Sequence, residues 1–279
     1  MKKISRRSFL AASGLTIAAL ALTACGGSAS TASSAASSVA AFSEAASTSA
    51  AAAELTTVEA GKLTMATNAA FPPYEMTTDA GAFEGIDIDT AQAIADKLGL
   101  ELQIDDMDFD AALLSVQQGK ADIAMAGVTV TDERKNVMDF SDSYATGIQS
   151  IIVPEGSDIA SPDDLAGKMI GTQRGTTGYI YCSDDFGDDA VVAYDDGLTA
   201  VQALNNGQVD AVVIDNAPAQ EFVAANPGLK ILDTSYAEED YAIGMAKGSS
   251  LEDAVNAALK ELKADGTLQS IVDKYITAE

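Results

Sequence analysis

The feature that most constrains this chain is a regular alternation of strand-like and helix-like segments, which begins after Glu54 and runs to the C-terminus. Residues 62–67 are typical of a short strand, and the apolar residues within 210–214 are typical of a buried one. Between them lie segments with apolar residues at helical spacing, for example the segment that Asp89 opens and Gly99 ends. Strands separated by helices predict an α/β fold with largely parallel sheets.

The expected strands cover residues 62–67, 101–105, 122–130, 148–153, 168–172, 190–194, 210–214, 229–232 and 241–246. The expected helices begin near Asp89, Asp110, Thr131, Ser161, Thr177, Leu198, Ala217, Ser250 and Leu268. This pattern divides into two runs near residues 145–150. In open sheets of this class, ligands bind beyond the carboxyl ends of the strands, so the residues that follow the strands are the candidates for function.

The charge and the residue types of the chain exclude several classes of function. The formal net charge is −26, and so acidic a surface repels nucleic acid and anionic lipid head groups. The chain contains no His, so neither a Ser-His-Asp nor a Cys-His triad can form, and most zinc sites lose their usual ligand. We therefore expect no nucleic-acid partner, no metal and no cofactor.

The first 26 residues predict export and anchoring. Basic residues at positions 2, 3, 6 and 7 precede an apolar stretch at 9–22, which is shorter than the about 20 residues of a good membrane-spanning helix. The stretch ends in Leu-Thr-Ala-Cys-Gly at 22–26, which resembles the lipobox of bacterial lipoproteins. This resemblance implies that residues 1–24 are a signal peptide and that an acylated Cys25 holds the protein at the outer face of a membrane. A plain secretory signal is the alternative.

Three further features concern the export route, the link to the folded part and the second cysteine. The pair Arg6-Arg7 looks like a twin-arginine export motif, although general secretion is at least as compatible. Residues 25–54 are nearly all Ala, Ser, Gly and Thr, which predicts a flexible tether. With Cys25 acylated, Cys182 has no intramolecular partner. We interpret it as a small buried apolar residue rather than a reactive thiol.

Three residues near predicted strand ends could shape an apolar part of a binding site. Phe71 follows the first strand and precedes two prolines, which would hold its ring as a flat wall. Phe109 follows the second strand and could form the opposite wall. Each ring could equally be an ordinary core residue. Gly127, which lies within the next expected strand, lets another group approach the backbone closely.

Charged and polar residues near the other strand ends complement a zwitterion. Arg134 offers a planar fork to a carboxylate, although it could also pair with Asp132 or Glu133 at the surface. The loop 173–178 leads into a helix, and the first amides of a helix bind anions. Asp215 follows a buried strand, where it could hold an ammonium group or merely cap the next helix. Together with the aromatic walls, these groups predict an amino acid as the ligand.

Six segments carry a resemblance to a known family: Phe-Pro-Pro-Tyr-Glu at 71–75, Gly-Ile-Asp-Ile-Asp at 85–89, the segment 127–134, Asp-Phe-Ser at 139–141, Gly-Thr-Thr at 175–177 and Asp-Ala-Val-Val-Ile-Asp at 210–215. From about residue 55 to residue 275, the chain resembles the polar-amino-acid-binding family of bacterial solute-binding proteins, family 3, which serves ABC importers. The resemblance implies a two-lobed, periplasmic-binding-protein-like fold of type II with two hinge crossovers. Lobe 1 would comprise residues 55–145 and 238–279, and lobe 2 residues 149–235.

The resemblance also implies roles for nine residues. Those that would hold the α-carboxylate of the ligand are Arg134, Thr129 and Thr177. Those that would hold its α-amine are Asp215 and Gly127, the latter through its carbonyl. Those that would surround its side chain are Phe71, Phe109, Asn68 and Gln173. The function implied is capture of an amino acid by a monomer whose lobes close around it, followed by delivery to an ABC-type permease.

Two alternative functions use the same fold. A sensory protein would report the amino acid to a membrane receptor with the same residues. A dehydratase-like enzyme would need a titratable general acid beside the ligand, whereas Asn68 and Gln173 are amides, so we expect no enzyme. These amides also favour a polar, uncharged ligand such as glutamine slightly over a cationic one, although Glu75 and other nearby acids leave a cation open.

Overall fold

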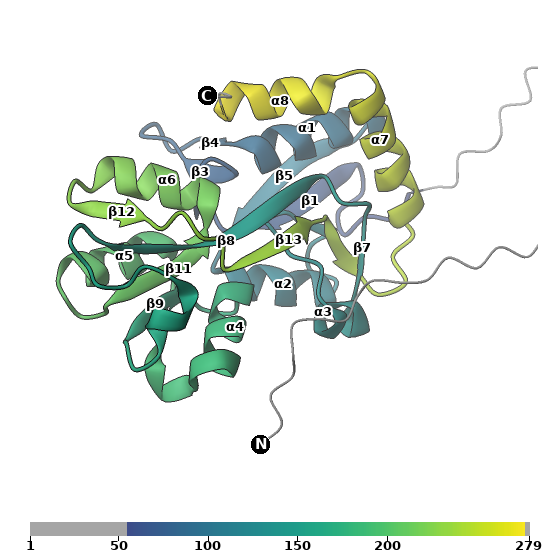
Figure 1. Ribbon diagram of the computed structural model, residues 1–279. Coiled ribbons are helices and arrows are strands. Elements are labelled where there is room, and N and C mark those ends of the chain that lie inside the picture. The colour runs from purple at the N-terminus through teal and green to yellow at the C-terminus, as the bar shows by residue number, and fades with distance from the viewer. Residues whose placement is uncertain (1–54, 277–279) are drawn as a thin grey trace, which may run out of the picture. The chain divides into compact units, whose positions relative to one another are not determined.

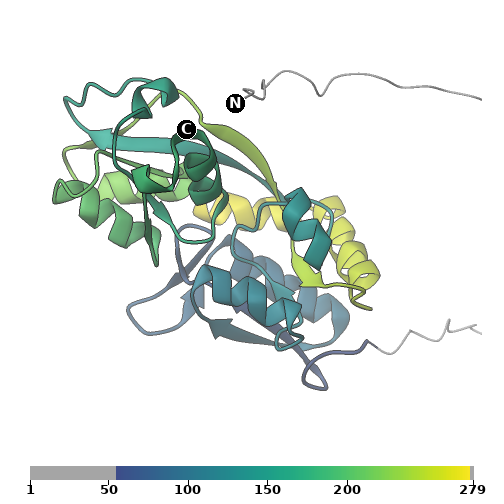
Figure 2. The ribbon, with the colours of Figure 1, turned by 90° about the horizontal axis from the view of Figure 1, so that it is seen from below.

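A computed structural model of the chain describes residues 55–276. The predicted signal peptide, the lipidation site at Cys25 and the tether lie outside the described residues. The described part forms two lobes, each built on a mixed sheet with helices packed against it, and the lobes are joined by long strands (Figure 1 and, from below, Figure 2). The predicted α/β class and two-lobed fold are confirmed. Within residues 55–276, no helix has the length and apolar character needed to cross a membrane.

Lobe 1 contains a five-stranded sheet with the strand order β5-β1-β6-β14-β7. Its strands are β1 (Lys62–Thr67), β5 (Glu101–Asp106), β6 (Ile123–Ala124), β7 (Met138–Phe140) and β14 (Gly244–Ala246). β1 runs parallel to β5 and β6, whereas β14 runs antiparallel to β6 and β7. Its helices are α1 (Ile86–Leu98), α2 (Phe109–Gln117), α3 (Asp132–Val137), α7 (Glu252–Ala264) and α8 (Thr267–Tyr275).

Lobe 2 contains a six-stranded sheet with the order β10-β9-β11-β8-β12, and β13 also pairs with β8. Its strands are β8 (Ala145–Pro154), β9 (Ile170–Gln173), β10 (Val191–Tyr194), β11 (Ala211–Asp215), β12 (Leu229–Ile231) and β13 (Ala237–Tyr241). β9 runs parallel to β10 and β11. Its helices are α4 (Thr177–Phe186), α5 (Gly197–Asn205) and α6 (Asn216–Ala225), with the short 3₁₀ turns η1 (Pro162–Leu165) and η2 (Asp188–Ala190).

The prediction of largely parallel sheets is wrong for the strands that join the lobes. β8 continues from Ala145 into the sheet of lobe 2, and β13 returns beside it, with Ala237 opposite Gln149 and Tyr241 opposite Ala145. A returning strand that pairs directly with the outgoing one must be antiparallel. β8 also runs antiparallel to β11 and β12. The pair β8 and β13 provides the two predicted hinge crossovers.

A small antiparallel sheet that the sequence pattern did not predict follows β1. It consists of β2 (Ala70–Phe71), β3 (Glu75–Thr77) and β4 (Phe83–Glu84), which are too short to show an alternation. Gly85 leads from it into α1, which begins at Ile86, three residues before the predicted start at Asp89. Its φ of 134° and the close carbonyl of Tyr74 leave no room for a Cβ. The carboxylate of Asp89 instead pairs with Lys274 at 2.7 Å.

The predicted strand at 122–130 is mostly a loop, because only β6 belongs to the sheet of lobe 1. Gly127 turns the chain with a φ of 55°, and Thr129 then makes a single bridge to β13. α3 follows with the predicted cap, since the side chain of Thr131 accepts a hydrogen bond from the backbone N–H of Arg134. The turn and the cap therefore fix the positions of three predicted site residues.

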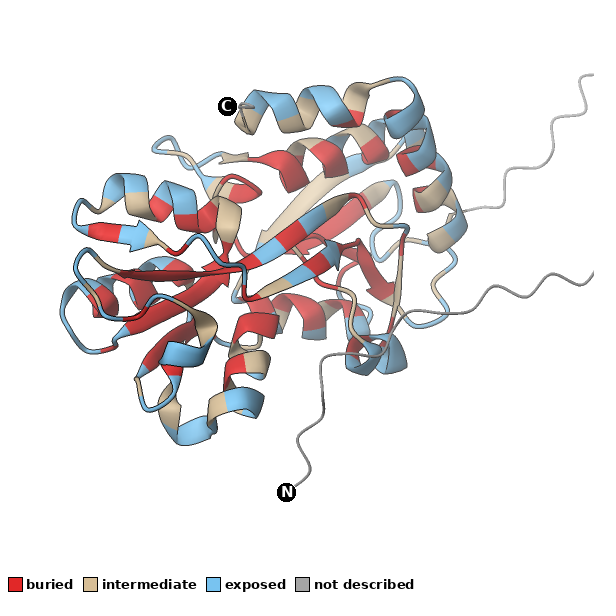
Figure 3. Cartoon of the chain, in the orientation of Figure 1, coloured by how far each residue is buried: buried red, intermediate tan, exposed pale blue. Residues whose placement is uncertain are grey.

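Buried apolar side chains lie along both sheets and the helix faces that cover them (Figure 3). In lobe 1 they include Leu63 and Met65 of β1, and in lobe 2 Ile151 and Ile152 of β8, all fully buried. Burying one such side chain contributes about 1.5–3 kcal/mol, so these cores hold the strand ends firmly. Cys182 packs in the core of lobe 2 as a buried free thiol, as its interpretation as an apolar residue predicts.

Candidate ligand-binding site

One cavity brings together residues from both lobes. Its lining contains all nine residues that the resemblance predicted for the site. Those from lobe 1 are Asn68, Phe71, Phe109, Gly127, Thr129 and Arg134, and those from lobe 2 are Gln173, Thr177 and Asp215. Three further residues, which the sequence reasoning did not place in the site, complete the lining: Glu75, Ala126 and Thr176.

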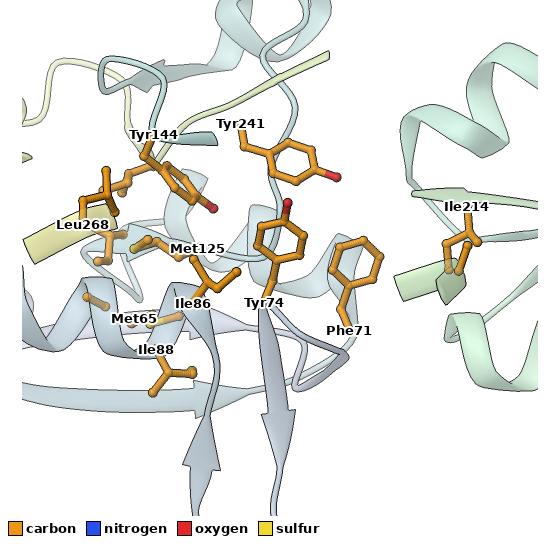
Figure 4. Close-up of a cluster of buried hydrophobic side chains, with 14 of the residues drawn as sticks. Met65, Phe71, Tyr74, Ile86, Ile88, Met125, Tyr144, Ile214, Tyr241 and Leu268 are labelled. Atoms are coloured by element: carbon orange, nitrogen blue, oxygen red, sulfur yellow. The ribbon is translucent and has the colours of Figure 1, made fainter. Parts of the chain in front are cut away.

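The aromatic wall on the side of lobe 1 is part of a stack of rings (Figure 4). Phe71 stacks on Tyr74 with the ring centres 5.9 Å apart, and Tyr74 meets the edge of Tyr241 at 5.3 Å. Phe71 thus serves both as a core residue and as a wall of the cavity, so the two interpretations of this ring are not exclusive. Phe109 lies on another side, under the guanidinium of Arg134 at 5.3 Å from its ring centre.

Arg134 is buried, with only 8% of its surface exposed, which rules out the alternative of a surface ion pair with its acidic neighbours. Its guanidinium donates to the carbonyl of Thr129 at 2.8 Å and, across the two lobes, to the carbonyl of Gly175 at 3.1 Å. Burial lowers the pKa of Arg134. Carbonyl oxygens only partly compensate a buried guanidinium, so this group can still attract a carboxylate.

Asp215 ends β11, and its buried side chain lines the cavity. It stands at the N-cap position of α6 but makes no capping hydrogen bond. Its carboxylate instead accepts from Nε2 of Gln149 at 2.7 Å and from the hydroxyl of Tyr241. Burial raises the pKa of Asp215 to about 7, which an adjacent ammonium group would reverse. The geometry therefore suits a cationic amine better than a helix cap.

Asn68 and Gln173 meet at one end of the cavity, each from its own lobe. Nε2 of Gln173 donates to Oδ1 of Asn68 at 2.9 Å, and Nδ2 of Asn68 donates to the carbonyl of Met107 at 3.0 Å. Nε2 of Gln173 also lies 3.3 Å from the carbonyl of Asp195. These bonds hold both amides in place, so a ligand side chain would meet a preorganised polar end of the cavity.

Glu75 is the most informative of the residues that the sequence reasoning did not place in the site. Its side chain is fully buried and lines the cavity, and its carboxyl shares a hydrogen bond with another buried acid, Asp87. Burial and the nearby charge of Asp87 raise the pKa of Glu75 well above its usual range. The motif at 71–75 contains this acid, but the three-residue strand β3 is too short for a sequence pattern to assign its inward direction.

Gly127 connects the cavity to a second buried acid. Its N–H donates to Asp87 at 3.0 Å, and the other oxygen of Asp87 accepts from the hydroxyl of Tyr144 at 2.7 Å. A Cβ at Gly127 would lie 3.0 Å from the ring of Phe71, so a larger residue would crowd this wall. The pKa of Asp87 is raised by burial to about 6. The backbone at Gly127 is thereby fixed with its N–H turned to Asp87.

Thr129 and Thr177 face each other from opposite lobes at the end of the cavity where Arg134 lies. Thr177 is the first residue of α4, whose cap Thr176 accepts from a backbone N–H at 3.3 Å. The first amides of a helix have no partner within it and carry partial positive charge, so they suit an anion. The hydroxyls of Thr129 and Thr177 both donate to Glu239, a buried residue of β13 that sequence reasoning did not single out.

Comparison with known proteins extends these observations. The family described as "Bacterial extracellular solute-binding proteins, family 3" matches residues 63–278. A probable histidine-binding protein of Neisseria gonorrhoeae is 32% identical over 277 residues, which cover 96% of this chain and 95% of that protein.

Solved structures give the same result. The arginine-, lysine-, histidine-binding protein ArtJ of Geobacillus stearothermophilus is 35% identical, with a TM-score of 0.75 over 78% of this chain and 96% of that one. An ancestral arginine-binding protein bound to glutamine is 41% identical, with a TM-score of 0.75 over 79% of this chain and 100% of that one. With this likeness in sequence and fold, the chain belongs to the bacterial extracellular solute-binding proteins of family 3.

Proposed function

We propose that this protein captures an amino acid between its two lobes outside the cell and delivers it to an ABC-type permease. The observation that carries the proposal is the cavity in which buried Arg134 of lobe 1 faces buried Asp215 of lobe 2. A zwitterion would satisfy both charges at once, and it would gain its full set of contacts only when the lobes close. Relatives whose names state amino-acid binding support the same function.

The assignment of the ligand groups follows the charges of the lining. The α-carboxylate would lie against Arg134, Thr129 and the N-terminal amides of α4, where Thr177 begins the helix. The α-amine would lie against Asp215 and the carbonyl of Gly127. The side chain would then extend between Phe71 and Phe109 toward Asn68 and Gln173. A calorimetric screen of the amino acids tests this function, after carried-over ligand is removed by unfolding and refolding. The function would be contradicted if none of the amino acids bound.

Glu75 changes the expected order of ligands. The amides of Asn68 and Gln173 alone favoured an uncharged side chain, but the buried carboxyl of Glu75 lies beside a second buried acid, Asp87, and a nearby cation would compensate their negative charge. We therefore propose that the ligand carries a cationic side chain, as arginine or lysine does. Two relatives bear on this choice, since one is named for arginine, lysine and histidine and the other is an arginine-binding protein bound to glutamine.

The ligand class can be measured directly. Titrations with L-arginine, L-lysine and L-glutamine should give a Kd for one of the cations at least about tenfold below that for glutamine, which corresponds to about 1.4 kcal/mol. Glu75→Gln should remove this preference. Asp79→Asn changes an exposed acid in the turn between β3 and β4 and should leave the preference unchanged. Tighter binding of glutamine by the unmodified protein would contradict the proposal.

The location of the protein is the next part of the proposal. A lipid on Cys25 would hold the chain, as a monomer, at the outer face of the membrane, while residues 25–54 act as a tether. Cys25→Ala should then shift the protein from the membrane fraction to the soluble fraction or leave it unprocessed. Mass spectrometry of the purified protein should find a lipid on Cys25, and sedimentation should give the mass of one chain. A chain without lipid would contradict the anchor.

We also propose that the ligand leaves the cavity chemically unchanged. The amides at positions 68 and 173 cannot act as general acids, and the family consists of solute-binding proteins. Glu75 does place one protonated carboxyl in the cavity, so turnover must be tested rather than argued from the amides alone. Ligand that is recovered after a day of incubation with the protein should be intact by mass spectrometry and NMR. Any protein-dependent product would contradict this part of the proposal.

A further inference from the structure

Glu239 occupies the point at which the two lobes and the hinge meet. It lies on hinge strand β13, and only 6% of its surface is exposed. Its Oε2 accepts three hydrogen bonds: from the hydroxyl of Thr129 at 3.1 Å, from the hydroxyl of Thr177 at 3.0 Å and from Nε2 of Gln149 at 3.0 Å. Thr129 belongs to lobe 1, Thr177 to lobe 2 and Gln149 to the other hinge strand. One carboxylate oxygen therefore connects four segments of the chain.

The hydroxyl geometry restricts what the two threonines can do for a ligand. Each hydroxyl has a single proton to donate. When Thr129 and Thr177 donate to Glu239, neither hydroxyl can also donate to a ligand carboxylate. In this arrangement the carboxylate can still be received by the guanidinium of Arg134 and by backbone N–H groups at the start of α4. The two hydroxyls can therefore still accept from a ligand ammonium group, but they cannot donate to the ligand carboxylate.

The same hinge residues also bind Asp215. Nε2 of Gln149 donates to Asp215 at 2.7 Å as well as to Glu239, and Tyr241, two residues after Glu239, donates to Asp215. Separation of the lobes would pull Thr177 away from Thr129, and Glu239 could no longer accept from both. Hydrogen bonds to a buried charge are strong, so their loss would oppose opening.

We propose that Glu239 is a positioning residue that holds the lobes together through Thr129 and Thr177, and that these two threonine hydroxyls act on the ligand carboxylate only through it. The proposal rests on the proposed binding of an amino acid in this cavity. It places the hinge itself among the determinants of affinity. If the closed arrangement is less populated without ligand, the apparent Kd rises in inverse proportion to its fraction.

The first experiment measures opening without any ligand. Spin labels at Lys120→Cys in lobe 1 and Asp189→Cys in lobe 2 of the full chain, in a Cys25→Ala and Cys182→Ser background, report the distance between lobes. After ligand is removed, Glu239→Ala should shift the distance distribution from the closed toward the open population. Thr129→Val and Thr177→Val should shift it in the same direction, and Glu238→Ala, which changes the exposed neighbour, should not. Identical distributions for all variants would overturn the proposal.

The second experiment asks whether the hydroxyl of Thr177 contacts the ligand. With L-arginine and L-glutamine as probes, Thr177→Val should raise the Kd by about tenfold or more, because closure is lost. In a Glu239→Ala background, the same change should have almost no further effect on Kd. An equal loss in both backgrounds would mean that the hydroxyl binds the ligand directly, and it would overturn the proposal.

Two safeguards keep the outcomes separate. Circular dichroism and thermal unfolding show whether Glu239→Ala folds. If it does not, Thr129→Val, Thr177→Val and the double variant form a double-mutant cycle in its place. The effects of the two changes on Kd should then be strongly non-additive, and additive losses would overturn the proposal. If the unmodified protein binds no amino acid, the proposed function fails, while the distance measurement still tests the bridge between the lobes.

Discussion

Gln173 donates a hydrogen bond to Asn68 across the cavity, at 2.9 Å, although the two residues are 105 positions apart in the chain. Asn68 follows β1 in lobe 1, and Gln173 is the last residue of β9 in lobe 2. The contact closes the end of the cavity that would receive a ligand side chain. The choice of an amide at both positions therefore bears on specificity as well as on closure.

Replacing this amide by an acid should change the preference of the site. Asn68→Asp keeps an oxygen that can accept from Gln173, adds a negative charge and loses the donation to the carbonyl of Met107. A charge at this end should favour arginine, whose side chain would supply the opposite charge. We expect the ratio of the glutamine Kd to the arginine Kd to rise at least about tenfold in calorimetric titrations. An unchanged ratio would show that the side chain does not reach Asn68.

Arg134 provides the clearest test of the carboxylate end. Arg134→Ala leaves a ligand carboxylate without its partner and should cost about 2–5 kcal/mol of binding free energy. Arg174→Ala is the matched control, because that arginine is half exposed and pairs with Asp195 at the surface. Its effect on Kd should be within about threefold, which is about 0.6 kcal/mol. Equal effects of the two changes would reject the assignment of the carboxylate end.

Much of the fold follows from local patterns in the sequence. β1 has the predicted bounds, because a segment of strand length in which Leu63 and Met65 alternate with polar residues ends before Asn68. α3 begins at the predicted cap, since a threonine side chain can satisfy the first amides of a helix wherever the chain lies. Strand ends gather at one edge of a sheet, so the candidates Arg134 and Asp215 could be proposed from their positions alone.

The rest depends on contacts between distant segments that no local pattern records. Glu75 lies in a three-residue strand, and only the packing of the small sheet turns it inward. Glu239 looks like one of several acids in a charged stretch, yet pairing with β8 directs it to threonines of both lobes. Gly85 precedes α1 at a point where the Cβ of any other residue would clash with the carbonyl of Tyr74, which is visible only in three dimensions.

The buried acids predict an unusual dependence of stability on pH. The pKa values of Glu75, Asp87 and Asp215 are raised by burial, the latter two to about 6 and about 7. In the unfolded chain such groups lose their protons near pH 4. Between about pH 4 and 7 the folded protein therefore binds more protons than the unfolded chain, and the free energy of unfolding falls as pH rises.

The measurement is thermal unfolding of the ligand-free protein, which should give a higher Tm at pH 5 than at pH 8. Repulsion among the many surface acids acts in the same direction, so a variant is needed to separate the two effects. The double change Glu75→Gln and Asp215→Asn removes two of the buried acids and should reduce the difference in Tm between these pH values. The same difference in the variant and the unmodified protein would assign the effect to the surface.

Asp215 predicts that ligand binding itself depends on pH. In the absence of ligand, burial raises its pKa to about 7, so below that pH the carboxyl is mostly protonated. An ammonium group beside it favours the ionised form and lowers its pKa, so binding at pH 6 must release a proton. The Kd should fall by up to about tenfold per pH unit as pH rises from about 5 to 7, and then level off.

Calorimetry in two buffers of different ionisation enthalpy measures the released protons directly. With L-glutamine as the probe, which brings no side-chain charge near Glu75, we expect between half a proton and one proton to be released at pH 6 and almost none at pH 8. Asp215→Asn keeps a similar shape without a titrating group, so it should bind more weakly, with a Kd that varies little over this range and with little proton release. If the variant keeps the pH dependence, the amine does not lie against Asp215, and Asp87, whose pKa is raised by burial to about 6, becomes the group to test next.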